Sequence, residues 1–147
     1  MILAIDPGPT DSGYALYHGG SVSGCGVLGN EHMLAVVESW GMADGNQCAI
    51  EMIASYGMAV GREVFETCVW IGRFQQMWRN PKAVRLIYRK DVKLHLCGSP
   101  RAKDTNIRQA LIDKLGAPGT KKAPGPTYGV KSHAWPALAV AVTASET

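Results

Sequence analysis

The chain has 147 residues, with 15 Lys and Arg against 12 Asp and Glu, so its formal net charge is only +3. Hydrophobic residues make up 46% of the chain, which argues against disorder and for a packed core. No apolar run approaches the roughly 20 residues that span a bilayer, and no basic segment precedes the first apolar run. We therefore expect no membrane anchor and no signal peptide, and one domain over residues 1–147.

The four cysteines are widely spaced and include no Cys-x-x-Cys pair. This pattern fits neither a zinc site nor a dense disulfide framework, and it favours reduced, buried thiols in a cytoplasmic protein.

The charges are divided unevenly along the chain. All 15 basic residues lie at or after Arg62. Residues 1–61 contain six acids and no base, a net charge of −6, whereas residues 62–147 contain 15 bases and six acids, a net charge of +9. Such asymmetry suggests a polyanionic partner, with nucleic acid as the first candidate.

The first third of the chain predicts three strands and a helix. The apolar run 1–5 has strand length, ends at Asp6 and is broken by the Pro-Gly-Pro that follows. Residues 13–17 and 21–28 read as two strands joined by a Gly-Gly turn, which is a β-hairpin signal. Apolar residues at helical spacing predict a helix over 32–40, with Asn30 as its N-cap.

The middle of the chain predicts a strand and a long helix. Residues 48–53 form a short apolar strand interrupted by one charge, Glu51. Residues 63–79 read as a helix whose apolar residues cover a wider arc than one sheet-facing stripe requires. Two explanations stay open, a deeply buried helix and a second face buried in a homodimer.

The last third predicts one strand and two clear helices. Residues 83–88 read as a buried strand, while 90–96 fit either a strand or a helix. Asp104 is the expected N-cap of a helix that ends at Leu115, before a Gly stop signal. After a loop rich in Gly, Pro and Lys, Ser132 is expected to cap a small-residue helix that packs tightly on a sheet.

This order of elements is typical of the ribonuclease H-like α/β fold. It implies a mixed five-stranded central sheet, antiparallel over the first three strands and then parallel, flanked by helices. In that fold the first and fourth strands lie side by side, so Asp6 and Glu51 would converge. Acids inside apolar runs are costly unless compensated, and two carboxylates suit Mg²⁺ or Mn²⁺, so we predict a metal site, with two ions for phosphodiester cleavage.

Ordered segments along essentially the whole chain resemble the RuvC-type Holliday-junction resolvases of the phage-encoded kind. The segments that carry the resemblance are Ala4–Gly8, Ser12–Leu16, Ile50–Glu51, Met58–Gly61, Arg101–Arg108 and His133–Ala141. The resemblance implies a dimeric, structure-selective endonuclease that uses Mg²⁺ or Mn²⁺ to nick paired strands of branched DNA, in a bacterial or phage-infected cytoplasm. It also implies that this enzyme needs no nucleotide cofactor.

The resemblance assigns both catalytic and metal-binding roles to Asp6, Glu51 and His133. The second acid that the family carries on its last helix falls on Pro136, which cannot ligate a metal. Asp11 and Asp104 are conceivable substitutes, although a turn and an N-cap are the ordinary roles of Asp at such positions. A His ligand also shifts the preference from Mg²⁺ toward Mn²⁺.

Basic residues near the probable helix start at Asp104 would hold the DNA backbone, because free N–H groups and cations together suit phosphates. The predicted DNA contacts are Arg89, Lys90, Lys93, Arg101, Lys103, Lys121, Lys122 and Lys131.

Two other functions were weighed. An actin-like kinase also begins strand–Asp-x-Gly–strand, but 147 residues leave no room for its second lobe. A protein that binds junctions with weak or no cleavage is the stronger alternative, because Pro136 removes an expected ligand.

Overall fold

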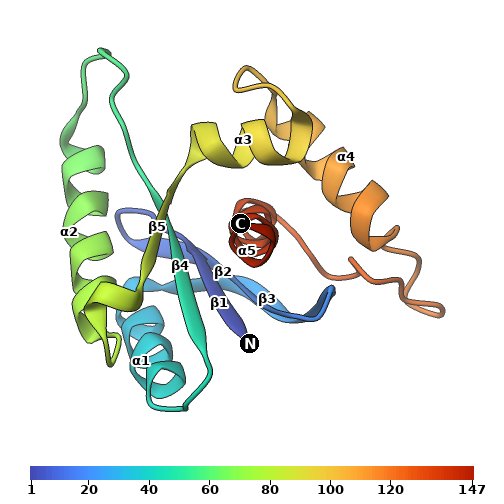
Figure 1. Ribbon diagram of the computed structural model, residues 1–147, viewed down its shortest axis with the longest axis horizontal. Helices are drawn as coiled ribbons and strands as arrows, with labels where there is room; N and C mark the ends of the chain where they lie inside the picture. Colours follow the sequence, from blue (N-terminus) through green and yellow to red (C-terminus); the bar gives the residue numbers. More distant parts are fainter.

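The computed structural model describes all of residues 1–147 (Figure 1). Five strands form one sheet in the order β3-β2-β1-β4-β5. The strands are β1 (Ile2–Asp6), β2 (Asp11–His18), β3 (Ser21–Gly29), β4 (Gln47–Met52) and β5 (Arg85–Tyr88). β1 pairs antiparallel with β2, and β2 with β3, whereas β4 runs parallel to both β1 and β5. The predicted mixed sheet is confirmed, and so is the Gly-Gly turn, whose two residues have φ of 57° and 85°.

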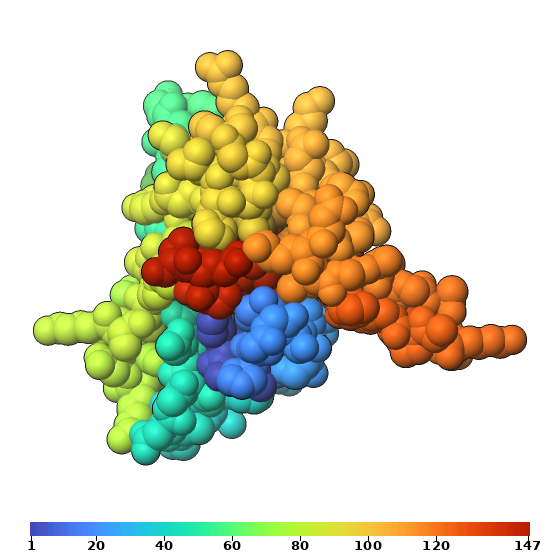
Figure 2. Space-filling view, turned by 45° about the vertical axis from the view of Figure 1, so that its right-hand side comes forward, coloured from blue at the N-terminus to red at the C-terminus, as the bar shows by residue number.

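The helices form a layer on each face of the sheet. They are α1 (Asn30–Gly41), α2 (Arg62–Met77), α3 (Arg89–Cys97), α4 (Asp104–Leu115) and α5 (Ala134–Glu146), with a 3₁₀ turn η1 (Pro81–Ala83) before β5. Figure 1 shows α1 and α2 on one face and α5 on the other, with α3 and α4 outside α5. In the space-filling view, the red end of α5 lies wedged between α3, α4 and the first strands (Figure 2).

The alternation of side chains along the central strands builds two cores. In β1, Leu3 and Ile5 belong to the core under α1 and α2, whereas Ile2 and Ala4 belong to the core under α5. Because strand side chains alternate, Asp6 follows Ala4 onto the α5 face, and in β4 Glu51 follows Ala49 onto the same face. The small residues of α5 are fully buried against the sheet, as predicted, so its backbone lies close to β1 and β2.

One expectation about burial is wrong, and one of the two explanations left open for the long helix is excluded. The strand over 83–88 was expected to be buried, but β5 is the edge of the sheet and only Ile87 of its four residues is buried. The helix α2 is not deeply buried either, because Phe65 and Val69 are 61% and 62% exposed while its buried residues lie on one side. The homodimer explanation for its second apolar face remains a prediction.

All three predicted helix caps also differ, and Asp104 is described with the site below. Asn30 is a buried residue inside the first turn of α1, and the N-cap position is Gly29. Ser132 has φ of 49° and lies one residue before the N-cap, His133, so α5 begins at Ala134. Pro136 therefore falls in the first turn of α5, where the N–H that proline lacks would have no partner within the helix.

The cysteines form no disulfide, and burial raises the pKa of the Cys48 thiol to about 12. No helix combines the length and the apolar character needed to cross a bilayer.

Candidate active site

Two largely buried carboxylates meet at the carboxyl ends of β1 and β4. The parallel register pairs Ile5 with Ile50, so the next residues, Asp6 and Glu51, lie side by side and both face α5. Their side chains are only 15% and 12% exposed. The sequence placed these two acids on neighbouring strands, and the structure brings them together as that topology requires.

His133 completes the cluster from the other end of the chain. Its Nδ1 lies 3.0 Å from Asp6 Oδ2, while the rest of the ring is open to solvent, with 68% of the side chain exposed. A histidine that has one nitrogen on a buried carboxylate and its other edge in solvent can orient a water or transfer a proton.

Burial raises the pKa of both acids, and repulsion from Asp6 adds to the effect at Glu51. Loss of solvent raises the pKa of Asp6, although its contact with His133 and the nearby charge of Arg89 act in the opposite direction. For Glu51, burial and then the charge of Asp6 raise the pKa to about 7, against the lowering effect of Arg89. Paired buried acids of this kind are costly without a positive partner, which is characteristic of functional sites.

The raised pKa predicts how stability changes with pH. Glu51 has a pKa near 4.5 when unfolded and about 7 when folded, so between these values the folded state holds a proton that the unfolded state has lost. Its contribution to stability is therefore lost as pH rises from about 4.5 to about 7, by an amount on the order of 3 kcal/mol.

We expect the melting temperature of the metal-free protein to fall across this pH range and Glu51→Gln to flatten the fall. The exposed Glu38→Gln is the matched control, and its melting curve should follow that of the wild type. Equal pH profiles for Glu51→Gln and the wild type would contradict the raised pKa.

A glycine in β2 allows His133 to lie close to the sheet. Gly13 of β2 pairs with Asp6 across the antiparallel ladder and faces α5. A Cβ at this position would lie 2.2 Å from the carbonyl oxygen of His133 and 2.8 Å from its Cβ. Only a residue without a side chain allows the start of α5 to approach the acids this closely.

The turn after Asp6 is held by a hydrogen-bonded triad. Ser12 Oγ donates to Asn30 Oδ1 at 2.6 Å, Asn30 Nδ2 donates to the Gly8 carbonyl at 2.9 Å, and the Gly8 N–H donates to Ser12 Oγ at 3.3 Å. Asn30 and Ser12 are both almost fully buried, so these bonds are protected from water. The sequence interpretation of Asn30 as a cap missed this role, because its partners lie about 20 residues away.

Arg89 lies inside the site, unlike the other predicted DNA contacts. Its Nη1 contacts Glu51 Oε1 at 3.2 Å, and its Nη2 donates to Asp104 Oδ1. The sequence predicted Asp104 as the N-cap of this helix, but Asp104 is the first residue within α4. The N-cap is Lys103, whose N–H donates to the side chain of Asn106. Asp104 instead links α4 to the site through Arg89.

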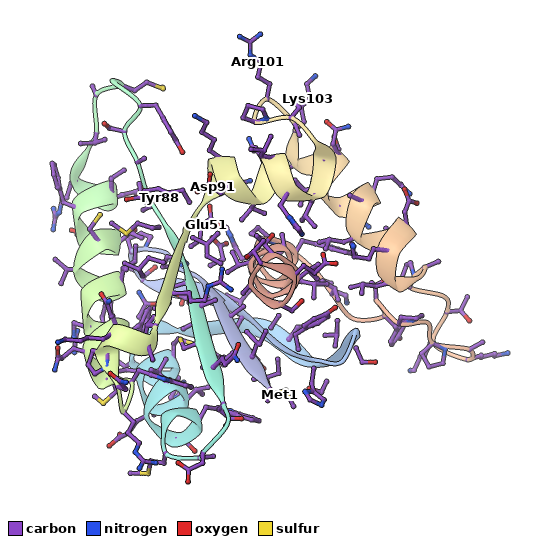
Figure 3. All side chains as sticks on the ribbon, in the orientation of Figure 1. Met1, Glu51, Tyr88, Asp91, Arg101 and Lys103 are labelled. Atoms are coloured by element: carbon purple, nitrogen blue, oxygen red, sulfur yellow. The ribbon has the colours of Figure 1, made fainter.

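The remaining predicted DNA contacts lie at the surface, and none of them has an ion-pair partner. They are Lys90 and Lys93 on α3, Arg101 and Lys103 between α3 and α4, and Lys121, Lys122 and Lys131 between α4 and α5. Figure 3 shows Arg101 and Lys103 projecting outward on the side of Glu51 that lies away from Met1. Their contact with DNA remains a prediction.

The donor chemistry of the two acids fits a divalent cation. Asp6 and Glu51 are a pair of hard oxygen ligands whose repulsion a cation would relieve, and Mg²⁺ keeps several waters in sites with few protein ligands. No three His, Cys, Asp or Glu side chains converge to form a preformed metal cage. Pro136 offers no ligand where the resemblance predicts an acid, and Asp11 lies exposed at the start of β2.

Solved structures with a similar fold are known. One of them, a structure of RuvC from Thermus thermophilus, matches with a TM-score of 0.65 and 18% identity, over 98% of this chain and 92% of that one. The chain has the RuvC fold. Another, the Thermus thermophilus RuvC in complex with Holliday junction substrate, matches with a TM-score of 0.70 and 20% identity over the same shares.

No protein-family model and no curated protein matches the sequence. At these identities the likeness to RuvC establishes the fold, and the roles of Asp6, Glu51 and His133 stay predictions.

Proposed function

We propose that this protein is a metal-dependent endonuclease that cuts four-way and other branched DNA junctions. The observation that carries the proposal is the pair of buried acids, Asp6 and Glu51, beside His133 at one end of a RuvC-like sheet. The fold alone supports many functions, so the site must carry the argument. The solved RuvC that binds a Holliday junction supports the choice of substrate class.

The residues suit phosphodiester hydrolysis. Asp6 and Glu51 would hold Mg²⁺ or Mn²⁺, which when bound supplies a Lewis acid for the scissile phosphate and its attacking water. His133 touches Asp6 with Nδ1 and presents its other nitrogen to solvent, where it can accept a proton from that water. The water oxygen bonds to phosphorus, the bond from phosphorus to the 3′ oxygen breaks, and the 3′ oxygen takes up a proton. The products are a 5′-phosphate and a 3′-hydroxyl.

A homodimer would place two such sites on one junction. Two-fold symmetry of the protein matches two cuts in paired strands. Phe65, Val69 and Gly72 lie on one exposed side of α2, and a side chain at Gly72 would meet no neighbouring atom. This face supports α2 as the contact between the two copies.

The proposal is tested by incubating a labelled four-way junction with the protein and Mg²⁺, or separately Mn²⁺. We expect paired nicks at the junction and none in a linear duplex of the same sequence. Binding without any nick in either metal would leave the alternative, a junction-binding protein without cleavage. The observation that favours this alternative is Pro136 at the expected position of an acid.

Binding should also weaken steeply with salt. The seven predicted DNA contacts without an ion-pair partner would release counterions from several phosphates, so we expect a loss of at least about 10³-fold in junction affinity between 50 and 200 mM salt. Mobility shifts without divalent metal measure this slope. Lys103→Gln should reduce the slope by about one, and a flat salt response would contradict the role of these residues as DNA contacts.

A further inference from the structure

The guanidinium of Arg89 occupies the side of the site that Pro136 leaves without an acid. One small cavity of about 40 Å³ is lined by Glu51, Arg89, Asp104 and Pro136, together with three apolar residues. Its only carboxylates are Glu51 and Asp104, and Arg89 contacts both. A second divalent ion on this side would have to displace Arg89 from two carboxylates at once.

The small size of the cavity also argues against a second ion. A volume of about 40 Å³ holds only one or two waters. Mg²⁺ keeps most of its hydration shell when it has few protein ligands, so a second ion inside this cavity would have to shed most of its waters or keep them in the solvent outside.

The formal charges balance with one ion. The acids Asp6, Glu51 and Asp104 contribute −3 and Arg89 contributes +1, which leaves −2. One divalent cation neutralises this charge, whereas a second would leave +2 around Glu51, whose side chain is only 12% exposed.

We propose that Arg89 is a built-in second cation of this site, so that the protein uses one divalent ion together with one guanidinium. The inference rests on the proposed nuclease function and names the composition of its metal site. In the cleavage step, a fixed positive charge beside Glu51 would stabilise the negative charge that develops as the bond from phosphorus to the 3′ oxygen breaks. This is the task that a second metal ion performs in a two-ion site.

Calorimetric titration of the full chain with Mn²⁺, without DNA, tests the stoichiometry. We expect one Mn²⁺ per chain. Two ions of comparable affinity in the wild type would overturn the proposal.

Arg89→Gln separates this role from a merely structural one. Removing a positive charge next to Glu51 should tighten Mn²⁺ binding by about tenfold or more, because the cation and Arg89 repel each other and compete for the same carboxylate. The same variant should cut junctions about 10²-fold more slowly, because it loses the fixed charge. A residue that only supported the fold would weaken binding and cleavage together.

Two further variants complete the test. Arg89→Lys keeps the charge and should lie closer to the wild type in both measurements. Arg79→Gln is the matched control, because Arg79 pairs with Asp44 at 2.8 Å on the surface and neither residue belongs to the site. Unchanged or weaker Mn²⁺ binding by Arg89→Gln would overturn the proposal. Absence of cleavage by the wild type would instead refute the nuclease function, and the stoichiometry and affinity measurements would still test Arg89.

Discussion

Asp6→Asn should abolish junction cleavage, with a loss of at least about 10³-fold, while leaving junction binding intact. Asn has nearly the same shape as Asp and can still accept a hydrogen bond from His133, so the geometry around β1 should survive. What it removes is one of two negative charges that a divalent cation needs. Because that charge also raises the pKa of Glu51, its loss should make the metal-free protein more stable to heat near pH 8.

Three measurements check this prediction: nicking of a labelled junction with Mn²⁺, mobility shift without metal, and thermal melting. Asp11→Asn is the matched control, because Asp11 is an exposed acid at the start of β2, and it should cut like the wild type. Cleavage by Asp6→Asn at the wild-type rate would remove Asp6 from the metal site. Loss of activity in both variants would point instead to the turn between β1 and β2.

Gly13→Ala should damage both the stability and the activity of the protein. The added Cβ would meet the backbone of His133 at 2.2 Å, and neither the central sheet nor the buried helix α5 can yield without cost. We expect a loss of about 1–3 kcal/mol in the free energy of unfolding. Cleavage should fall about 10²-fold even where the variant is folded, because His133 is pushed away from Asp6.

Thermal melting and junction nicking below the melting temperature of the variant measure the two effects separately. Gly24→Ala in β3 is the control, since its added Cβ would meet only the end of the Leu16 side chain, at 3.3 Å. If Gly13→Ala melted and cut like Gly24→Ala, the close packing of α5 on β2 would not matter for the site.

Much of the fold could be predicted because its signals are local. The apolar run of β1, the Gly-Gly turn between β2 and β3, and the Gly stop after α4 each depend on a few neighbouring residues. Strand order then followed from the sequence of elements, and it placed Asp6 next to Glu51. The predictions failed where burial depends on the position of a strand in the sheet. The apolar residues of β5 predicted a buried strand, but β5 is an edge strand.

The polar residues were harder to place. Asn30 and Asp104 both read as helix caps, which is the common local role of such side chains. In the structure Asn30 bonds to Ser12 and Gly8, and Asp104 bonds to Arg89. A short polar side chain has several partners within reach in a folded protein, and the chain alone does not show which one lies closest.

By itself, the sequence determined that this protein has a mixed α/β sheet, two acids at the ends of adjacent central strands, and an acidic first part followed by a basic second part. Only the tertiary structure decided how those two parts meet. Because Gly13 has no side chain, His133 can lie close enough to contact Asp6. Arg89, which the sequence suggested as a DNA contact, pairs with Glu51. The reason is physical. Periodicity in the sequence shows which face of a helix or strand a residue occupies. Charge pairing depends instead on distances, and these are set only when α3, α4 and α5 pack on the sheet.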